Sequence, residues 1–278
     1  MIPVDLLIVG GLTIDRFADG RRQAGGSVLH GSRAARRAGW RVATVCLAGP
    51  EPEVATALTE LAAAGPSRVA WTAASIQFGI DDRFEPRRLT LDHAPPPMHP
   101  DPAWSRDPPP AATLVAPVAG EIDGGVLAAL PRGISVALIQ GWLRTVGPDR
   151  MVRPSPAGGM PPDVRAWVAR VDVVLASRED LAADGSDPAD QLRALRSACG
   201  PRPALVITLG ADGYLVDLPG LGARRRPAAR AVRPSTSVGA GDAFAALLAA
   251  AMGGGASVSA AAESAAEGVA AFLEAPPP

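Results

Sequence analysis

Apolar and polar residues along this chain follow two patterns, and together they predict an α/β fold. Some runs are almost wholly apolar and rich in β-branched residues, as buried parallel strands are. They span residues 5–11, 41–49, 113–120, 134–141, 171–177 and 204–210. Alanine-rich segments with helical spacing lie between them, at residues 27–39, 53–65, 124–133, 163–171 and 188–200. This alternation predicts a mostly parallel central sheet with helices on both faces.

One segment departs from this alternation. From Val69 to Leu91, apolar and polar residues alternate about a turn near Asp81 and Asp82. That pattern predicts an antiparallel hairpin with one solvated face. The proline-rich stretch 94–110 follows it and cannot form regular structure. We therefore expect a small β-flap on a large α/β body. One domain is expected, since 278 residues with 47% hydrophobic content can bury a full core.

Charge and residue usage exclude several functions. The formal net charge is −1, so neither nucleic acid nor an anionic membrane is an expected partner. The apolar N-terminus lacks the basic flank of a signal peptide, and Cys46 and Cys199 are expected to be buried free thiols of a cytoplasmic protein. The chain contains no lysine, which excludes P-loop, protein-kinase and Schiff-base chemistry.

The clearest candidate site is the segment TSVGAGDAF, residues 236–244. Gly239, Ala240 and Gly241 place backbone N–H groups together at the expected start of a helix, where unpaired amides and the helix dipole favour an anion. Asp242, in the first turn, can accept a proton from a hydroxyl. A phosphate cradle beside a base suits phosphoryl transfer to an alcohol. The structural alternative is a glycine-rich turn whose acid stabilises an ordinary helix.

The same segment resembles the C-terminal signature of the ribokinase-like PfkB carbohydrate kinases, Asp-Thr-x-Gly-Ala-Gly-Asp-x-Phe. The likeness covers most of the chain. The first strand followed by Asp15, and then AGGSVLHGSRAARRAG (24–39), resemble the family's N-terminal Gly-Gly motif and its helix. VITLGADGYLV (206–216) resembles its strand-turn-strand beside the nucleotide, and QGWLR (140–144) is similar to the inositol-kinase-like branch. A ribokinase-like three-layer sandwich is implied, with lid segments near 12–25 and 69–95.

The resemblance implies a kinase that uses ATP and Mg²⁺ and acts on a sugar, a polyol or a similar small molecule. Asp242 would be the base, and the amides of Gly239 to Gly241 would hold the charge on the transferred group. The other implied residues bind the substrate (Asp15, Gly25, Gly26, His30 and Arg144) or the nucleotide (Thr208, Gly210 and Gly213). Each also has an ordinary structural interpretation, such as a loop acid for Asp15 or a solvated arginine for Arg144. The lid could also pair two copies into a homodimer.

Several positions depart from the family pattern and keep a second hypothesis open. Thr236 stands where the signature has Asp, and His30 where members often carry Asn. Ser177 and Asp180 occupy the ends of the family's Asn-x-x-Glu, so Asp180 is a weak candidate metal ligand and the metal site stays unassigned. The alternative function is a non-catalytic sugar- or nucleotide-binding protein that retains the fold. A dinucleotide-dependent oxidoreductase is disfavoured, because Gly10 and Gly11 lack the GxGxxG spacing.

Overall fold

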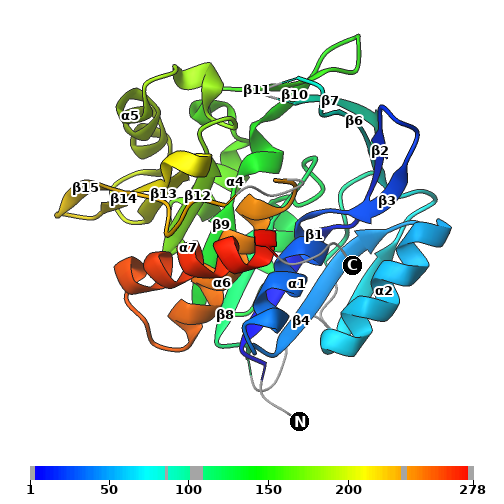
Figure 1. The fold of residues 1–278 in the computed structure, drawn as a ribbon, viewed down its shortest axis with the longest axis horizontal. Coiled ribbons are helices and arrows are strands. Elements are labelled where there is room, and N and C mark those ends of the chain that lie inside the picture. The colour runs from blue at the N-terminus through cyan, green and yellow to red at the C-terminus, as the bar shows by residue number, and fades with distance from the viewer. Residues whose placement is uncertain (1–3, 85–86, 101–108, 233–236, 275–278) are drawn as a thin grey trace.

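The main sheet of the computed structural model, which describes residues 4–84, 87–100, 109–232 and 237–274, has the strand order β15-β14-β13-β12-β9-β8-β1-β4-β5 (Figure 1). Neighbouring strands are parallel from β13 to β5, whereas β14 and β15 are antiparallel. The bounds are β1 (Leu6–Gly11), β4 (Val42–Ala48), β5 (Ser67–Trp71), β8 (Ala112–Ala116), β9 (Ile134–Leu138), β12 (Val173–Ser177), β13 (Ala204–Thr208), β14 (Tyr214–Leu218) and β15 (Gly222–Arg226). The predicted mostly parallel sheet is confirmed.

Helices cover both faces of this sheet and complete the three layers of the predicted α/β sandwich. One face carries α1 (Ser27–Arg37), α2 (Pro52–Ala64), α6 (Ala240–Gly253) and α7 (Val258–Glu274). The other carries α3 (Gly124–Ala128), α4 (Pro162–Val168) and α5 (Pro188–Cys199). Apolar side chains of the strands meet each helical layer in a separate buried cluster. No helix of the described residues is long and apolar enough to cross a membrane.

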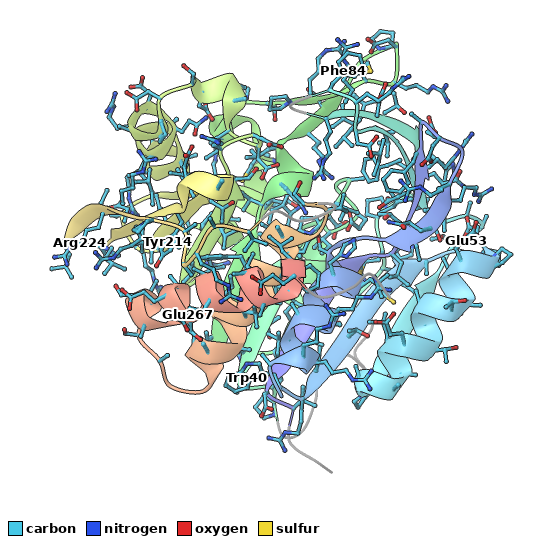
Figure 2. The ribbon with its side chains drawn as sticks, in the orientation of Figure 1. Trp40, Glu53, Phe84, Tyr214, Arg224 and Glu267 are labelled. Carbon is cyan, nitrogen blue, oxygen red and sulfur yellow. The ribbon has the colours of Figure 1, made fainter. Side chains whose placement is uncertain are left out.

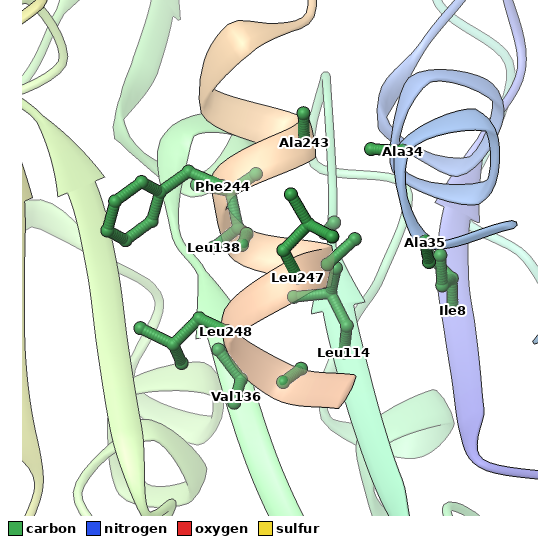
Figure 3. Close-up of a cluster of buried hydrophobic side chains, with 14 of the residues drawn as sticks. Ile8, Ala34, Ala35, Leu114, Val136, Leu138, Ala243, Phe244, Leu247 and Leu248 are labelled. Atoms are coloured by element: carbon green, nitrogen blue, oxygen red, sulfur yellow. The ribbon is translucent and has the colours of Figure 1, made fainter. Parts of the chain in front are cut away.

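Helix α6 is buried along most of its length, which explains its composition. Alanine fills half of its 14 positions, and small side chains let the helix lie close to the sheet and to its neighbours α1 and α7. Its larger side chains, Phe244, Leu247 and Leu248, belong to the same buried cluster as the strand residues Leu138 and Leu114 (Figure 3). A helix that is apolar on nearly every side belongs inside a protein. The start of α6 is thereby held at a fixed place above the sheet.

A second, smaller sheet arches over the carboxyl ends of the central strands (Figure 1). Its order is β3-β2-β6-β7, and its bounds are β2 (Thr13–Phe17), β3 (Arg22–Gly25), β6 (Ile76–Asp81) and β7 (Arg88–His93). The hairpin of β10 (Arg144–Val146) and β11 (Val152–Pro154) lies beside β7. There the amide of Leu91 donates to the carbonyl of Arg150 at 2.9 Å. The edge of the small sheet at β7 is therefore attached to the hairpin of β10 and β11.

The hairpin expected over residues 69–91 is shorter than predicted. Residues Ser67–Trp71 form β5, the parallel edge strand of the main sheet, and only β6 and β7 form the antiparallel hairpin. An edge strand with one partly exposed face alternates in hydrophobicity as a hairpin strand does, so this pattern does not separate the two. The correct division depends on the pairing of β5 with β4, which is a long-range contact.

The main sheet has a topological switch point between β1 and β8. The chain leaves β1 toward β4 on one side, while β8, β9 and β12 follow on the other. Connections that diverge from neighbouring parallel strands leave a crevice at the carboxyl ends, and ligands of open α/β sheets bind there. The arch of β2, β6 and β7 roofs this crevice.

Two leucine substitutions test how much the buried side chains of α6 contribute to the free energy of unfolding. Leu248→Ala removes a side chain that is fully buried, and we expect the free energy of unfolding to fall by about 2–5 kcal/mol. Leu221→Ala is the matched control, since Leu221 is 69% exposed, and its effect should lie within about 0.5 kcal/mol. Urea denaturation measures both. Equal effects at the two positions would contradict the described packing.

Candidate active site

An open cavity lies at the switch point beneath the small sheet. Several residues predicted from the sequence line it together, although they are far apart in the chain: Asp15, Gly26, His30, Arg144, Gly239 and Asp242. Gly25 lies directly behind Asp15, because a Cβ on Gly25 would meet that carboxylate. The lining therefore contains two acids, one imidazole and one guanidinium from the predicted set.

The start of α6 presents unpaired amides at the cavity. Gly239 caps the helix in the left-handed conformation, with φ 83° and ψ −1°. The amide of Ala240 donates to the carbonyl of Ser237 at 3.2 Å. Within the described ranges, the amides of Gly241 and Asp242 have no acceptor. Free N–H groups and the helix dipole make this end of α6 suited to an anion.

Gly239 is required here for two separate reasons. Its positive φ is costly for residues that carry a Cβ. A Cβ at this position would also lie 2.6 Å from Cγ of His30. The imidazole of His30 therefore packs directly on the backbone that begins α6.

His30 is buried between the two acids of the cavity. Burial lowers the pKa of His30 below its ordinary value, against the attraction of Asp242 and Asp15. The neutral imidazole has one donor and one acceptor nitrogen. Its Nε2 is buried and has no hydrogen-bond partner among the described residues. A buried polar atom left without a partner is unfavourable, so a ligand hydroxyl in the cavity would satisfy it.

Asp15 lies at the opposite side of the cavity, on β2. Its Oδ1 accepts a hydrogen bond from Oγ1 of Thr13 at 2.7 Å. Burial raises the pKa of Asp15 above its ordinary value, although the Thr13 hydroxyl opposes that shift. A carboxyl group has capacity for further hydrogen bonds beyond this one. The geometry suits a group that accepts from, or donates to, hydroxyls of a small polar ligand.

Arg144 reaches the cavity from the start of β10 without forming an ion pair among the described residues. It donates to the carbonyl of Val118 and, at 3.4 Å, to Oε1 of Gln140. Burial lowers the pKa of Arg144, against the attraction of Asp180 and Asp242. Its guanidinium also lies over the ring of Phe78 at 5.3 Å. Arg144 thus contacts the small sheet through Phe78, the loop after β8 through Val118, and the turn after β9 through Gln140.

Gln140 was not singled out as a site residue from the sequence, yet its side chain bonds to Ser27, Asp242 and Arg144 at the cavity. Its side-chain amide donates to Asp242 Oδ1 at 3.1 Å and to Ser27 Oγ at 3.0 Å. Its signals in the sequence were the segment QGWLR and a polar residue just after the apolar run of β9, where strand ends meet ligands. Arg87, between β6 and β7, also lines the cavity and gave no signal in the sequence.

The predicted nucleotide residues lie outside this cavity. Thr208 ends β13, and its carbonyl accepts from the amide of Arg178 at 3.0 Å. Gly210 and Gly213 form the turn to β14, both with positive φ, at 64° and 92°. The structure therefore places them at the carboxyl edge of the sheet, in a group separate from the lining. Thr236 and Arg233 lie outside the described residues.

No metal centre is evident in the described part of the chain. Asp180, the weak candidate, accepts hydrogen bonds from the amide and hydroxyl of Ser177 at 2.9 and 2.8 Å, which close its own turn. Within the described ranges, no group of three or more His, Cys, Asp or Glu side chains could hold an ion. Magnesium is usually held by one or two carboxylates together with substrate phosphates, so a bound polyphosphate would have to supply most of its ligands.

The basic run that precedes the anion cradle faces outward. Arg224 lies on β15, the outer edge of the main sheet, where its side chain projects away from the molecule (Figure 2). Arg226 and Arg230 form exposed ion pairs with Glu263 and Glu274. This run is therefore solvated and does not face the cavity.

Comparison with known proteins identifies the family. Residues 135–273, half of the chain, match the model of the pfkB family carbohydrate kinase. The chain belongs to this family. Membership makes it a phosphotransferase with an alcohol acceptor, a sugar or polyol kinase. No curated protein sequence gives a significant match.

Solved structures share the fold along nearly the whole chain. A pyrophosphate-dependent kinase of the ribokinase family, complexed with a pyrophosphate analog and myo-inositol, has a TM-score of 0.78 at 18% identity and covers 98% of this chain and 96% of its own. Ribokinase of Arabidopsis thaliana, complexed with ribose and ATP, has a TM-score of 0.72 at 16% identity, with 99% and 94% covered. Ribokinase of Cryptococcus neoformans var. grubii with ADP has 0.71 at 18%, with 98% and 94% covered. The predicted ribokinase-like fold is confirmed.

Alanine substitutions at two glycines of α6 test the start of the helix. We expect Gly239→Ala to lower the free energy of unfolding by about 1–3 kcal/mol, because alanine is strained at this φ and meets His30. Gly241→Ala is the matched change, since nothing lies within 4 Å of its added Cβ, and it should raise stability by about 0.4–1 kcal/mol. Chemical denaturation compares them. The prediction is wrong if both change stability in the same direction.

The pH dependence of stability tests the burial of His30. Its folded pKa lies below the ordinary value of 6.5, so its contribution is complete above pH 6.5 and is lost as the pH falls below that value. Asp15 acts in the opposite sense, because its raised pKa favours the folded state toward low pH. Subtracting the profile of His30→Gln from that of the wild type isolates the histidine. His93→Gln, at an exposed position on β7, should keep the wild-type profile.

Proposed function

We propose that this chain transfers the terminal phosphoryl group of ATP to a hydroxyl of a sugar or polyol held in the cavity, with Asp242 as the base. The observation that carries the proposal is the position of Asp242. Its carboxylate lines the cavity, while the free amides of its own residue and of Gly241 open the same helix. A proton acceptor and an anion cradle thus lie side by side, next to buried polar groups suited to hydroxyls.

The transfer needs one proton acceptor and stabilisation of charge. The acceptor hydroxyl gives its proton to Asp242, and its oxygen forms the new bond to phosphorus. The bond between that phosphorus and the bridging oxygen of ATP breaks, and ADP leaves with the electron pair. The amides of Gly241 and Asp242, which have no acceptor among the described residues, donate to the oxygens of the group in transit. Positioning and electrostatics supply most of the rate in such reactions.

Other residues of the cavity lining bind the acceptor molecule in this proposal. Asp15 and the open nitrogen of His30 bind hydroxyls from two sides, and Arg144 donates from a third. Thr208, Gly210 and Gly213 are assigned to the nucleotide, at the neighbouring strand ends. Mg²⁺, when it enters with ATP, neutralises charge on the phosphates.

Pairing of two copies through the small sheet belongs to the same proposal. In the described residues β3 is the free edge of that sheet, and free edges readily take another strand. Analytical ultracentrifugation of the purified chain tests it, and a monomer at all concentrations would contradict it.

A substrate panel tests the proposed reaction. Purified protein is incubated with Mg²⁺, with ATP or pyrophosphate as donor, and with sugars, inositols and nucleosides in turn. Pyrophosphate is included because one structural neighbour depends on it. We expect ADP release with at least one polyol or sugar, and a fall in kcat of about 10²- to 10⁴-fold in Asp242→Asn, which lacks the base.

Asp187→Asn is the matched control. Asp187 caps α5 by accepting from the amide of Ala189, and asparagine caps helices as well. It should keep wild-type turnover. Absence of turnover with every pair would overturn the proposal. Thermal stabilisation by a ligand without turnover, equal in wild type and Asp242→Asn, would instead favour a non-catalytic binding protein.

A further inference from the structure

Gln140 connects three elements that meet at the cavity. It follows β9, and its side-chain nitrogen bonds to Ser27, the first residue of α1, and to Asp242 in the first turn of α6. Its oxygen accepts from Arg144 at the start of β10. These contacts span 102 and 113 residues of sequence, so the fold alone brings them together.

The orientation of the Gln140 amide is determined by its partners. Arginine can only donate, so the side-chain oxygen must face Arg144. The nitrogen therefore faces Asp242 and donates to its Oδ1. Reversing the amide would place two donors against each other and two acceptors against each other. Arg144 is itself held by the carbonyl of Val118, which keeps this orientation in place.

Gln140 engages one of the two oxygens of Asp242 and leaves the other. Oδ1 receives the amide at 3.1 Å, while Oδ2 has no protein donor among the described residues. A carboxylate held at one oxygen cannot rotate freely about its side chain. Because Asp242 lines the cavity and its Oδ1 is engaged, Oδ2 is the oxygen left to accept a proton there.

We propose that Gln140 is the positioning residue of the Asp242 base, fixing Oδ1 so that Oδ2 meets the acceptor hydroxyl. This inference rests on the proposed kinase function. The charged or titratable groups that face Asp242 come from every element around it: Asp15 from β2, His30 from α1, Arg87 from the segment between β6 and β7, and Arg144 from β10. Gln140 is neutral, so it adds a hydrogen-bond donor without adding charge to this group.

Two substitutions of Gln140, each with a side chain of similar length, distinguish a residue that positions Asp242 from one that only fills space. Gln140→Met keeps the bulk and removes the donor. Gln140→Glu keeps the shape and the bond from Arg144, but replaces the donor with a second carboxylate beside Asp242. A residue that only filled space would tolerate both changes. Thermal unfolding of each variant shows whether it folds.

The pH profile of kcat/KM on the best acceptor is the decisive measurement. In Gln140→Met we expect kcat to fall about 10- to 100-fold, because a hydrogen bond to a charged group is lost. The acid limb of the profile should move to higher pH, since the ionised form of the base loses a donor. Gln140→Glu should move that limb further, because like charges disfavour ionisation.

Gln191→Met is the matched control, away from the cavity. The Gln191 amide donates to carbonyls of Arg178, Leu181 and Gly185, so its loss should lower stability and leave the acid limb in place. Wild-type kcat and an unmoved limb in both Gln140 variants would overturn the positioning role alone. Failure of both variants to fold would assign Gln140 a structural role and overturn it too. Absence of turnover in the wild type would remove the proposed function and this role with it.

Discussion

The burial of α6 between the main sheet and its neighbouring helices is the constraint on which the site depends. Because this helix is packed on nearly every side, its first turn cannot shift without disturbing the core. Gly239 begins the helix at a position where a larger residue would collide with His30. The free amides, the carboxylate of Asp242 and the imidazole are therefore held in one rigid group. Preorganised donors need no rearrangement when charge develops on a transferred phosphoryl group.

Much of the architecture could be predicted, because its signals are local. Buried parallel strands read as apolar runs, and the glycine-rich start of α6 is contiguous in sequence. The small sheet was harder. Its strands come from segments on either side of α1, β4 and β5, and the pairing of β2 with β6 depends on contacts that no local pattern contains. For the same reason Ser67–Trp71 resembled part of a hairpin, although it closes the edge of the main sheet.

The residues of the site also divide into those with a local signal in the sequence and those that depend on long-range contacts. Asp15, Gly26, His30 and Asp242 belong to contiguous motifs, and the structure brings them to one cavity. Arg87 belongs to no motif and Gln140 only to the short segment QGWLR, because their importance arises from what lies across the cavity. The role of Gln140 follows only from the fold, which brings Ser27 and Asp242 within hydrogen-bond distance of its amide. Sequence patterns can thus propose groups that perform chemistry, whereas groups that orient them emerge from the packing of distant elements.

The hairpin of β10 and β11 contacts both the small sheet above the cavity and Gln140 below it. Its far end bonds to β7 through Leu91 and Arg150, while its first residue, Arg144, holds the oxygen of Gln140. The small sheet and the amide bonded to Asp242 are thus connected through a strand of three residues. A ligand enclosed beneath the small sheet would therefore lie between two parts of one continuous hydrogen-bonded chain, which would link its enclosure to the alignment of the carboxylate.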